Sequence, residues 1–241
     1  MSGFFVALSF LTRLPVPPLA PEKAGSLALA APWLPAAGAM VGLLVAVFAA
    51  LGASFGPWVG ALLALLAWVA VSGGLHLDGL GDVADGLGAA HGNPQRFVEV
   101  ARDPHTGSFG TIAIALQIAA KLVLLATVIE ALGVKAAAIG ILLIAVWARW
   151  GTLALGRAVP PLTEGMASRL AAGISTRVVV LEGAALALAT AFLVPVLLTA
   201  LPVTLALALY WRVRLGGITG DCHGASIEIT ESALLFALLL A

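Results

Sequence analysis

The sequence is a succession of long apolar runs separated by short polar segments. A helix that crosses the hydrocarbon core of a bilayer needs about 20 mostly apolar residues, and these runs reach that length. They cover residues 31–55, 57–75, 109–128, 134–155, 178–211 and a last stretch that ends at Ala241. Pro195 and Pro202 divide the fifth run into two helices, because proline interrupts a helix. The pattern predicts an all-α, polytopic integral membrane bundle of about seven transmembrane helices, in contact with the lipid bilayer.

The composition excludes several other classes of protein. Hydrophobic residues make up 61% of the 241 residues and charged residues 10%, whereas an ordinary soluble domain carries about 25% charged residues. Twelve basic and twelve acidic side chains cannot coat a soluble domain of this length, and they leave no large basic face for a nucleic acid. No repeat of fixed period and no second domain is visible, so residues 1–241 are expected to form a single transmembrane domain.

The basic residues predict the orientation of the bundle. With seven spans, the polar segments 76–108, 156–177 and 212–225 fall on the same side of the membrane as the N-terminus. That side holds Arg13, Lys23, Arg96, Arg102, Arg157, Arg169, Arg177, Arg212 and Arg214, and the other side holds Lys135. Such a bias marks the first side as cytoplasmic. The piece before Pro15 is too short to span and is expected to be interfacial or re-entrant.

Three aspartates follow the second apolar run at helical spacing. Asp78, Asp82 and Asp85 are separated by four and three residues, which places them on one face of a helix. Three like charges on one face repel one another. A divalent cation would offset this repulsion, and oxygen ligands favour Mg²⁺, Mn²⁺ or Ca²⁺ over zinc. The segment therefore predicts a metal site, with a solvated acidic loop between two spans as the alternative.

A second polar segment, residues 102–110, precedes the next apolar run. Pro104 ends the preceding helix, and Ser108 is expected to cap the following one. The free N–H groups of that helix start, together with the guanidinium of Arg102, suit a phosphate group. An ordinary capped loop is the alternative interpretation.

A third polar segment, residues 216–231, is a glycine-rich turn that leads into a helix. Asp221, Glu228 and Glu231 fall on roughly one face of this helix, which anchoring alone does not require. Two cationic side chains interrupt apolar runs. Arg149 is expected to be paired, and Lys121 either pairs with a carboxylate or reaches to the membrane interface. Aspartates, arginines and a hard cation at one membrane face indicate phosphoryl or phosphodiester transfer.

The three segments together resemble the cobalamin synthase family, the adenosylcobinamide-GDP ribazoletransferases. The residues that carry the resemblance are His76-Leu77-Asp78-Gly79-Leu80, Asp82, Asp85-Gly86, Arg102-Asp103, Gly107, Gly110, Thr219-Gly220-Asp221, Gly224-Ala225 and Glu228. The opening Phe10-Leu11-Thr12-Arg13-Leu14-Pro15-Val16-Pro17 is similar to the start of that family, and Glu164-Gly165-Met166 resembles its Glu-Gly-Leu-Gly loop. The match covers nearly the whole chain in the expected order.

The resemblance implies a multi-pass enzyme of the bacterial cytoplasmic (inner) membrane, with its active face in the cytoplasm. It would join adenosylcobinamide-GDP to α-ribazole, or to α-ribazole 5′-phosphate, and release GMP with the help of Mg²⁺. A ribose hydroxyl would attack the phosphorus on the cobinamide side. No nucleic acid partner is expected, and a homo-oligomer is left open.

Roles follow for the residues that match these motifs. The expected metal ligands are Asp78, Asp82, Asp85 and Asp103. The expected catalytic carboxylates, one of which acts as base, are Asp85, Asp103 and Asp221. The expected substrate contacts are Arg13, His76, Arg102, His105, Arg149 and Glu228. Positions 104–106 are Pro-His-Thr where the family more commonly has Ser and Arg. If that arginine binds phosphate, His105 replaces it as a weaker, pH-dependent donor.

Two other functions were weighed against this one. CDP-alcohol phosphotransferases also use membrane-helix aspartates and a metal, but their DGxxAR and GxxxDxxxD patterns are absent, since Asp78-Gly79 is not followed by Ala-Arg. A cation or proton transporter would scatter ionisable groups along its depth. The one-sided distribution of charge disfavours that alternative.

Overall fold

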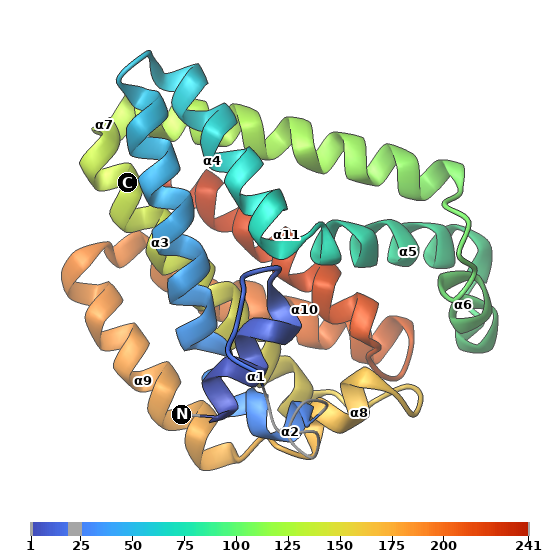
Figure 1. Cartoon of the computed structure of the whole chain (residues 1–241). Coiled ribbons are helices and arrows are strands. Elements are labelled where there is room, and N and C mark those ends of the chain that lie inside the picture. The colour runs from blue at the N-terminus through green and yellow to red at the C-terminus, as the bar shows by residue number, and fades with distance from the viewer. Residues whose placement is uncertain (1, 19–25, 241) are drawn as a thin grey trace.

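The computed structural model describes residues 2–18 and 26–240, so Lys23 and Ala241 lie outside the described residues. Its regular elements are helices, as the apolar runs predict (Figure 1). In the described part of the chain, the only strand-like pairing is an isolated bridge between Pro161 and Ile218. The elements are α1 (Ser2–Leu11), α2 (Leu27–Ala30), η1 (Ala31–Trp33), α3 (Leu34–Ala53), α4 (Pro57–Ser72), α5 (Leu75–Ala90), α6 (Pro94–Ala101), α7 (Ser108–Ala158), α8 (Met166–Ala171), α9 (Thr176–Leu193), η2 (Pro195–Thr199), α10 (Ala200–Arg214) and α11 (Gly220–Leu238).

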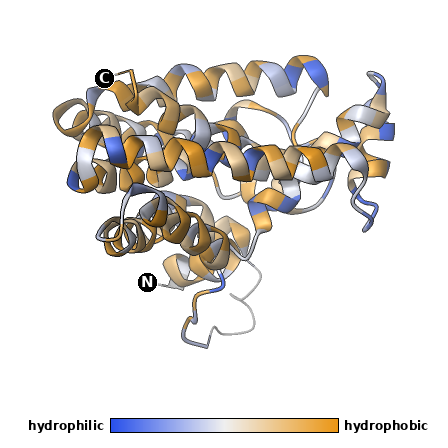
Figure 2. Cartoon of the chain, turned by 90° about the horizontal axis from the view of Figure 1, so that it is seen from above, coloured by the Kyte–Doolittle hydropathy of each residue, from blue (hydrophilic) through white to orange (hydrophobic). Residues whose placement is uncertain are grey.

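The outer surface of the helices is apolar. Figure 2 shows hydrophobic residues along most of the length of the helices. Large apolar side chains lie open on α3, α4, α7, α9 and α10, and Phe55 and Phe192 reach 81% and 82% exposure. A soluble monomer rarely exposes apolar patches of this extent. The surface is therefore suited to lipid rather than to water.

Within residues 2–18 and 26–240, four helical stretches are long and apolar enough to cross a membrane by themselves. They are Leu27–Ala53, Ser108–Ala158, Thr176–Leu193 and Pro195–Arg214. A fifth candidate arises if α4 and α5, which are bent by 83° relative to each other, count as one broken span. The division of the long run 178–211 into two helices is confirmed, because α9 ends before Pro195 and a 3₁₀ turn leads into α10.

The 51 residues of α7 correspond to two of the predicted spans. At about 1.5 Å per residue, a straight helix of this length would be more than twice as long as the hydrocarbon core is thick. Gly133 adopts φ +74° and ψ 159°, which breaks the helix into residues 108–132 and 134–158. Figure 1 shows the second part turning back along the bundle.

Two glycines produce the bend between α4 and α5. Gly73 and Gly74 have φ of +63° and +75°, the left-handed region that residues with a Cβ atom rarely adopt. The first glycine forms the C-cap of α4 and the second the N-cap of α5. This corner carries the aspartate-bearing helix away from the direction of α4.

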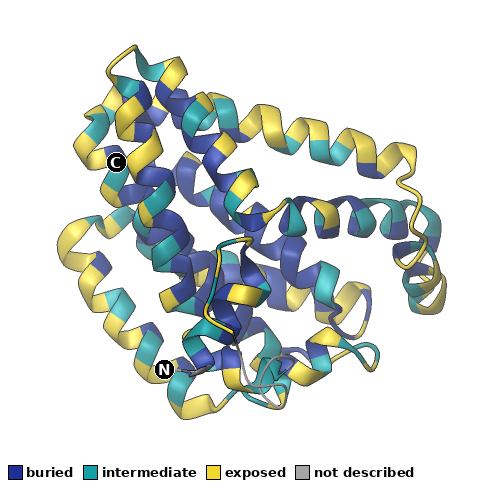
Figure 3. Ribbon diagram, in the orientation of Figure 1, coloured by how far each residue is buried: buried dark blue, intermediate teal, exposed yellow. Residues whose placement is uncertain are grey.

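Helix α11 lies inside the bundle, packed against α7 and α5. Figure 3 shows that it is largely buried, in contrast to the exposed outer faces of α7 and α9. It carries Asp221, Glu228 and Glu231 and is not among the candidate spans. At the other end of the chain, α1 has 10 residues and is too short to cross a bilayer, as predicted.

The corner glycines give a test of the backbone conformation. The substitution G74A forces a residue with a Cβ atom into the left-handed region, which costs about 1–2 kcal/mol although nothing lies within 4 Å of the added atom. The matched substitution G151A lies within α7, where the nearest atom to an added Cβ is Thr204 Oγ1 at 3.4 Å. The midpoint temperature of thermal unfolding in detergent should therefore be lowered by G74A and unchanged or raised by G151A. Equal effects of the two variants would contradict the bend described here.

Candidate functional site

The aspartates of α5 gather with a fourth carboxylate from α11. Asp78, Asp82 and Asp85 lie on one helix at the spacing that the sequence predicts. Asp82 is close enough to three other carboxylates to be repelled by their negative charges: Asp78, Asp221 and Asp85. An added Cβ atom at Gly79 would lie 3.1 Å from the Asp221 main chain, so the glycine permits this close approach of α5 and α11. Two segments far apart in the sequence thus form one acidic group.

The carboxylates do not converge on a single point. Among the described residues, no group of three or more His, Cys, Asp or Glu side chains is arranged to hold a metal ion. Asp78 is exposed, while Asp82 and Asp221 are half-buried. The predicted metal ligands therefore remain a prediction, supported by the shared electrostatic surroundings of the aspartates.

Asp85 ties α5 to the start of α7. Its two carboxylate oxygens accept hydrogen bonds from the backbone N–H groups of Gly107 and Gly110, at 2.7 and 2.9 Å. The expected cap by Ser108 is wrong, because Ser108 is the first residue of α7 and its N-cap, Gly107, has no side-chain cap. A carboxylate from α5 instead fills the helix start that was expected to face a phosphate.

Asp103 and His105 pair in the exposed loop between α6 and α7. Asp103 Oδ1 accepts a hydrogen bond from the His105 backbone N–H at 2.9 Å and lies 2.7 Å from His105 Nδ1. These two interactions, the backbone bond above all, hold the pKa of Asp103 below its usual value. The pair places the predicted phosphate donor His105 beside a carboxylate that remains ionised at neutral pH.

Three hollows surround Asp78 and Asp221. The histidine hollow, of about 580 Å³ with its solvent-open part, is lined by residues that include His76, His223, Asp78 and Asp221. The Arg13 hollow, of about 1090 Å³ on the same measure, shares Asp78 with it. The Arg102 hollow, of about 520 Å³, shares Asp221 with it and also contains Glu164. The two aspartates therefore stand at the borders between adjoining binding spaces.

Some of the predicted substrate contacts line these hollows and others do not. Arg13, His76 and Arg102 each line one of them. Arg102 is close enough to Asp221 for its charge to act on that carboxylate. The three remaining predicted substrate contacts, His105, Arg149 and Glu228, are not among the residues that line the three hollows.

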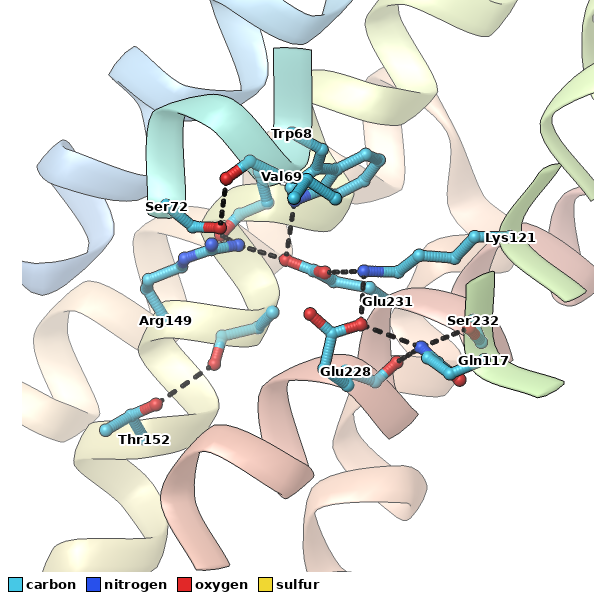
Figure 4. Close-up of polar contacts among 12 residues, drawn as sticks. Trp68, Val69, Ser72, Gln117, Lys121, Arg149, Thr152, Glu228, Glu231 and Ser232 are labelled. Atoms are coloured by element: carbon cyan, nitrogen blue, oxygen red, sulfur yellow. Dashed lines mark hydrogen bonds and ion pairs between the residues drawn. The ribbon is translucent and has the colours of Figure 1, made fainter. Parts of the chain in front are cut away.

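Arg149 and Glu228 belong instead to a buried ionic cluster, drawn in Figure 4. Lys121 of α7 lies 2.6 Å from Glu228 Oε2 and 2.5 Å from Glu231 Oε2. The guanidinium of Arg149, on the second half of α7, pairs with Glu231 Oε1. The cluster therefore contains two cationic and two acidic side chains, whose formal charges cancel. Lys121 pairs with carboxylates, one of the two possibilities that the sequence left open.

Neutral donors complete the ionic cluster. Trp68 Nε1 of α4 donates a hydrogen bond of 3.2 Å to Glu231 Oε1. Gln117 Nε2 donates to Glu228 Oε2 and to Ser232 Oγ, each at 2.9 Å. Sequence reasoning did not identify Trp68 and Gln117, because a tryptophan in an apolar run gives no sign that its N–H points at a carboxylate on another helix.

The model of the family "Cobalamin-5-phosphate synthase" matches residues 3–239. A protein of Thiobacillus denitrificans called adenosylcobinamide-GDP ribazoletransferase is 45% identical, with 100% of this chain and 95% of the relative covered. Proteins of the same name from Novosphingobium aromaticivorans and Laribacter hongkongensis are 44% and 47% identical to this chain. The similarity covers all of this chain and 97% and 98% of the two relatives. No solved structure gives a significant match.

The buried ionic cluster predicts an asymmetric response to charge removal. The substitution E231Q leaves Lys121 and Arg149 with one carboxylate between them in a fully buried site. Breaking one side of a buried ion pair costs about 3–5 kcal/mol of folding stability. The midpoint temperature of thermal unfolding in detergent should therefore be much lower for E231Q than for the wild-type protein. The matched variant E130Q removes the charge of an exposed carboxylate on α7 instead. An E231Q protein as stable as E130Q would show that the cluster does not stabilise the bundle.

Proposed function

The chain belongs to the cobalamin-5-phosphate synthase family, and on that premise we propose that it catalyses the adenosylcobinamide-GDP ribazoletransferase reaction at the aspartates between the three hollows. A ribose hydroxyl of α-ribazole, or of its 5′-phosphate, attacks the phosphorus attached to cobinamide. The new P–O bond forms as the bond to GMP breaks, and GMP leaves with the electron pair. The observation that carries this location is that Asp78 and Asp221 are each shared by two adjoining hollows.

The acidic group suits a hard divalent cation. Asp78, Asp82, Asp85 and Asp221 offer only oxygen ligands, and their mutual repulsion would be relieved by a cation. We assign Asp78 and Asp82 as the principal Mg²⁺ ligands, with Asp85 and Asp103 as further ones. When bound, Mg²⁺ would neutralise charge on the diphosphate oxygens of the substrate.

Asp221 is the best placed of the three candidate bases. Both oxygens of Asp85 accept N–H bonds, and His105 stabilises the ionised form of Asp103. The bonds from His105 oppose proton uptake by Asp103, and both oxygens of Asp85 are already engaged. The hydrogen bond that Asp221 accepts from Thr219 Oγ1 is longer, at 3.5 Å, and Asp221 borders both the histidine hollow and the Arg102 hollow. It would take the proton of the attacking hydroxyl.

Two arginines would bind the phosphates of the nucleotide substrate. Arg13 and Arg102 are exposed; Arg13 lines a hollow bordered by Asp78, and Arg102 lines a hollow bordered by Asp221. A guanidinium can donate two parallel hydrogen bonds to a phosphate group. Arg149 has a carboxylate partner inside the bundle, so we assign it, together with Glu228, to holding α11 in position.

The polar ends of the helices would face the cytoplasm of a bacterium. We propose seven spans, formed by α3, α4, the two parts of α7, α9, α10 and α11. In Figure 1 the α3–α4 turn, the break in α7 and the C-terminal end lie at the upper left, whereas α6, α8 and the loop before α11 lie toward the lower right. Basic residues are in excess at the end that carries α6, α8 and the loop before α11, which supports a cytoplasmic location for the site.

The reaction is tested with the full-length protein in lipid bilayers. GMP release from adenosylcobinamide-GDP should require both α-ribazole and Mg²⁺. The substitution D221N should lower the rate by about 10²–10⁴-fold, because it removes the general base. The substitution D82N should raise the Mg²⁺ concentration needed for half-maximal rate.

The matched control is E99Q, which changes an exposed carboxylate of α6 outside the hollows and should keep the wild-type rate. No GMP release from folded wild-type protein would contradict the proposed function. Unchanged Mg²⁺ dependence in D82N would leave the transfer reaction standing and would overturn the metal assignment.

A further inference from the structure

Two histidines of the bundle are buried without hydrogen-bond partners. His76 is 2% exposed and His223 is 6% exposed. Neither ring nitrogen of either side chain has a partner among the described residues. Burying a polar group without a partner costs free energy, so a pair of such side chains is unusual and points to a ligand that supplies the missing bonds.

Both rings line the same hollow. His76 comes from the first turn of α5 and His223 from the first turn of α11, and both border the histidine hollow. An added Cβ atom at Gly224 would lie 3.4 Å from His76 Cα, so the two helix starts pack closely. Most of the other lining side chains are apolar: Phe10, Leu11, Leu34, Leu75, Leu170 and Ile227.

We infer that the histidine hollow binds the aromatic base of the ribazole substrate, with one of His76 and His223 hydrogen-bonded to the free ring nitrogen of the base and the other to its ribose. This inference rests on the proposed function and adds a binding place for the acceptor substrate. A benzimidazole joined to ribose through one nitrogen keeps the other as an acceptor, and the rest of the ring is apolar. A neutral histidine can donate one hydrogen bond from its ring, so an apolar slot with such donors matches this base.

The other parts of the substrates suit the hollow less well. Among the described residues, no arginine or lysine lines the hollow to bind a phosphate, and a corrinoid is far larger than a space of about 580 Å³ that is partly open to solvent. Its polar border is formed by Asp78 and Asp221. A base held among the apolar side chains would therefore leave its ribose beside Asp221, where the attacking hydroxyl must lose its proton.

The test separates the two substrates of the full-length protein in lipid nanodiscs. The substitutions H76N and H223N should each raise the KM for α-ribazole by about tenfold, the loss expected for one good hydrogen bond. The KM for adenosylcobinamide-GDP should stay within about twofold of the wild-type value. The matched control is H91N, which changes an exposed histidine and should alter neither KM.

A second measurement does not depend on the buried variants folding. Nitrogen NMR of ¹⁵N-histidine protein resolves four side chains, and H91N and H105N identify the two exposed ones. Addition of α-ribazole alone should shift the two remaining ring signals and leave that of His91 in place. Unmoved buried signals in a preparation that releases GMP would overturn this inference and leave the proposed function intact. Absence of GMP release would overturn the proposed function itself.

Discussion

A bundle in contact with lipid can keep a carboxylate in its interior only where a partner offsets its charge. Helix α11 carries two such carboxylates, and the partners come from both halves of α7. Glu231 lies between Lys121 and Arg149, while Glu228 shares Lys121 with it. The ionic cluster thus fixes α11 against the two halves of one broken helix, and the rest of the arrangement depends on that position.

The functional end of α11 extends from this anchored part. Asp221 and His223 lie in its first turn, two turns before Glu228. Close packing at Gly79 and Gly224 then sets α5 beside that turn, which brings the α5 aspartates to Asp221. Asp85 in turn holds the start of α7. One helix with paired charges at its centre therefore positions the acidic group, the histidine hollow and the start of α7.

The sequence was informative where a signal is local. The apolar runs predicted the helical bundle, the spacing of Asp78 and Asp85 predicted their common helix, and isolated charges in apolar runs predicted paired side chains. It was not informative about contacts across the fold. Capping of α7 by a carboxylate from α5 rather than by Ser108 depends on how two helices meet. The unpartnered state of His76 and His223 likewise appears only when α5 and α11 are packed together.

We propose above that the aspartates of α5 hold a metal ion in contact with the substrate phosphates, and this proposal can be tested directly. Mn²⁺ can replace Mg²⁺ among oxygen ligands, and its electron paramagnetic resonance reports nearby phosphorus. We expect ³¹P coupling from adenosylcobinamide-GDP to bound Mn²⁺ in the wild-type protein. The coupling should be lost in D78N and D82N and retained in E99Q. The same coupling in D78N and D82N as in the wild-type protein would contradict this proposal.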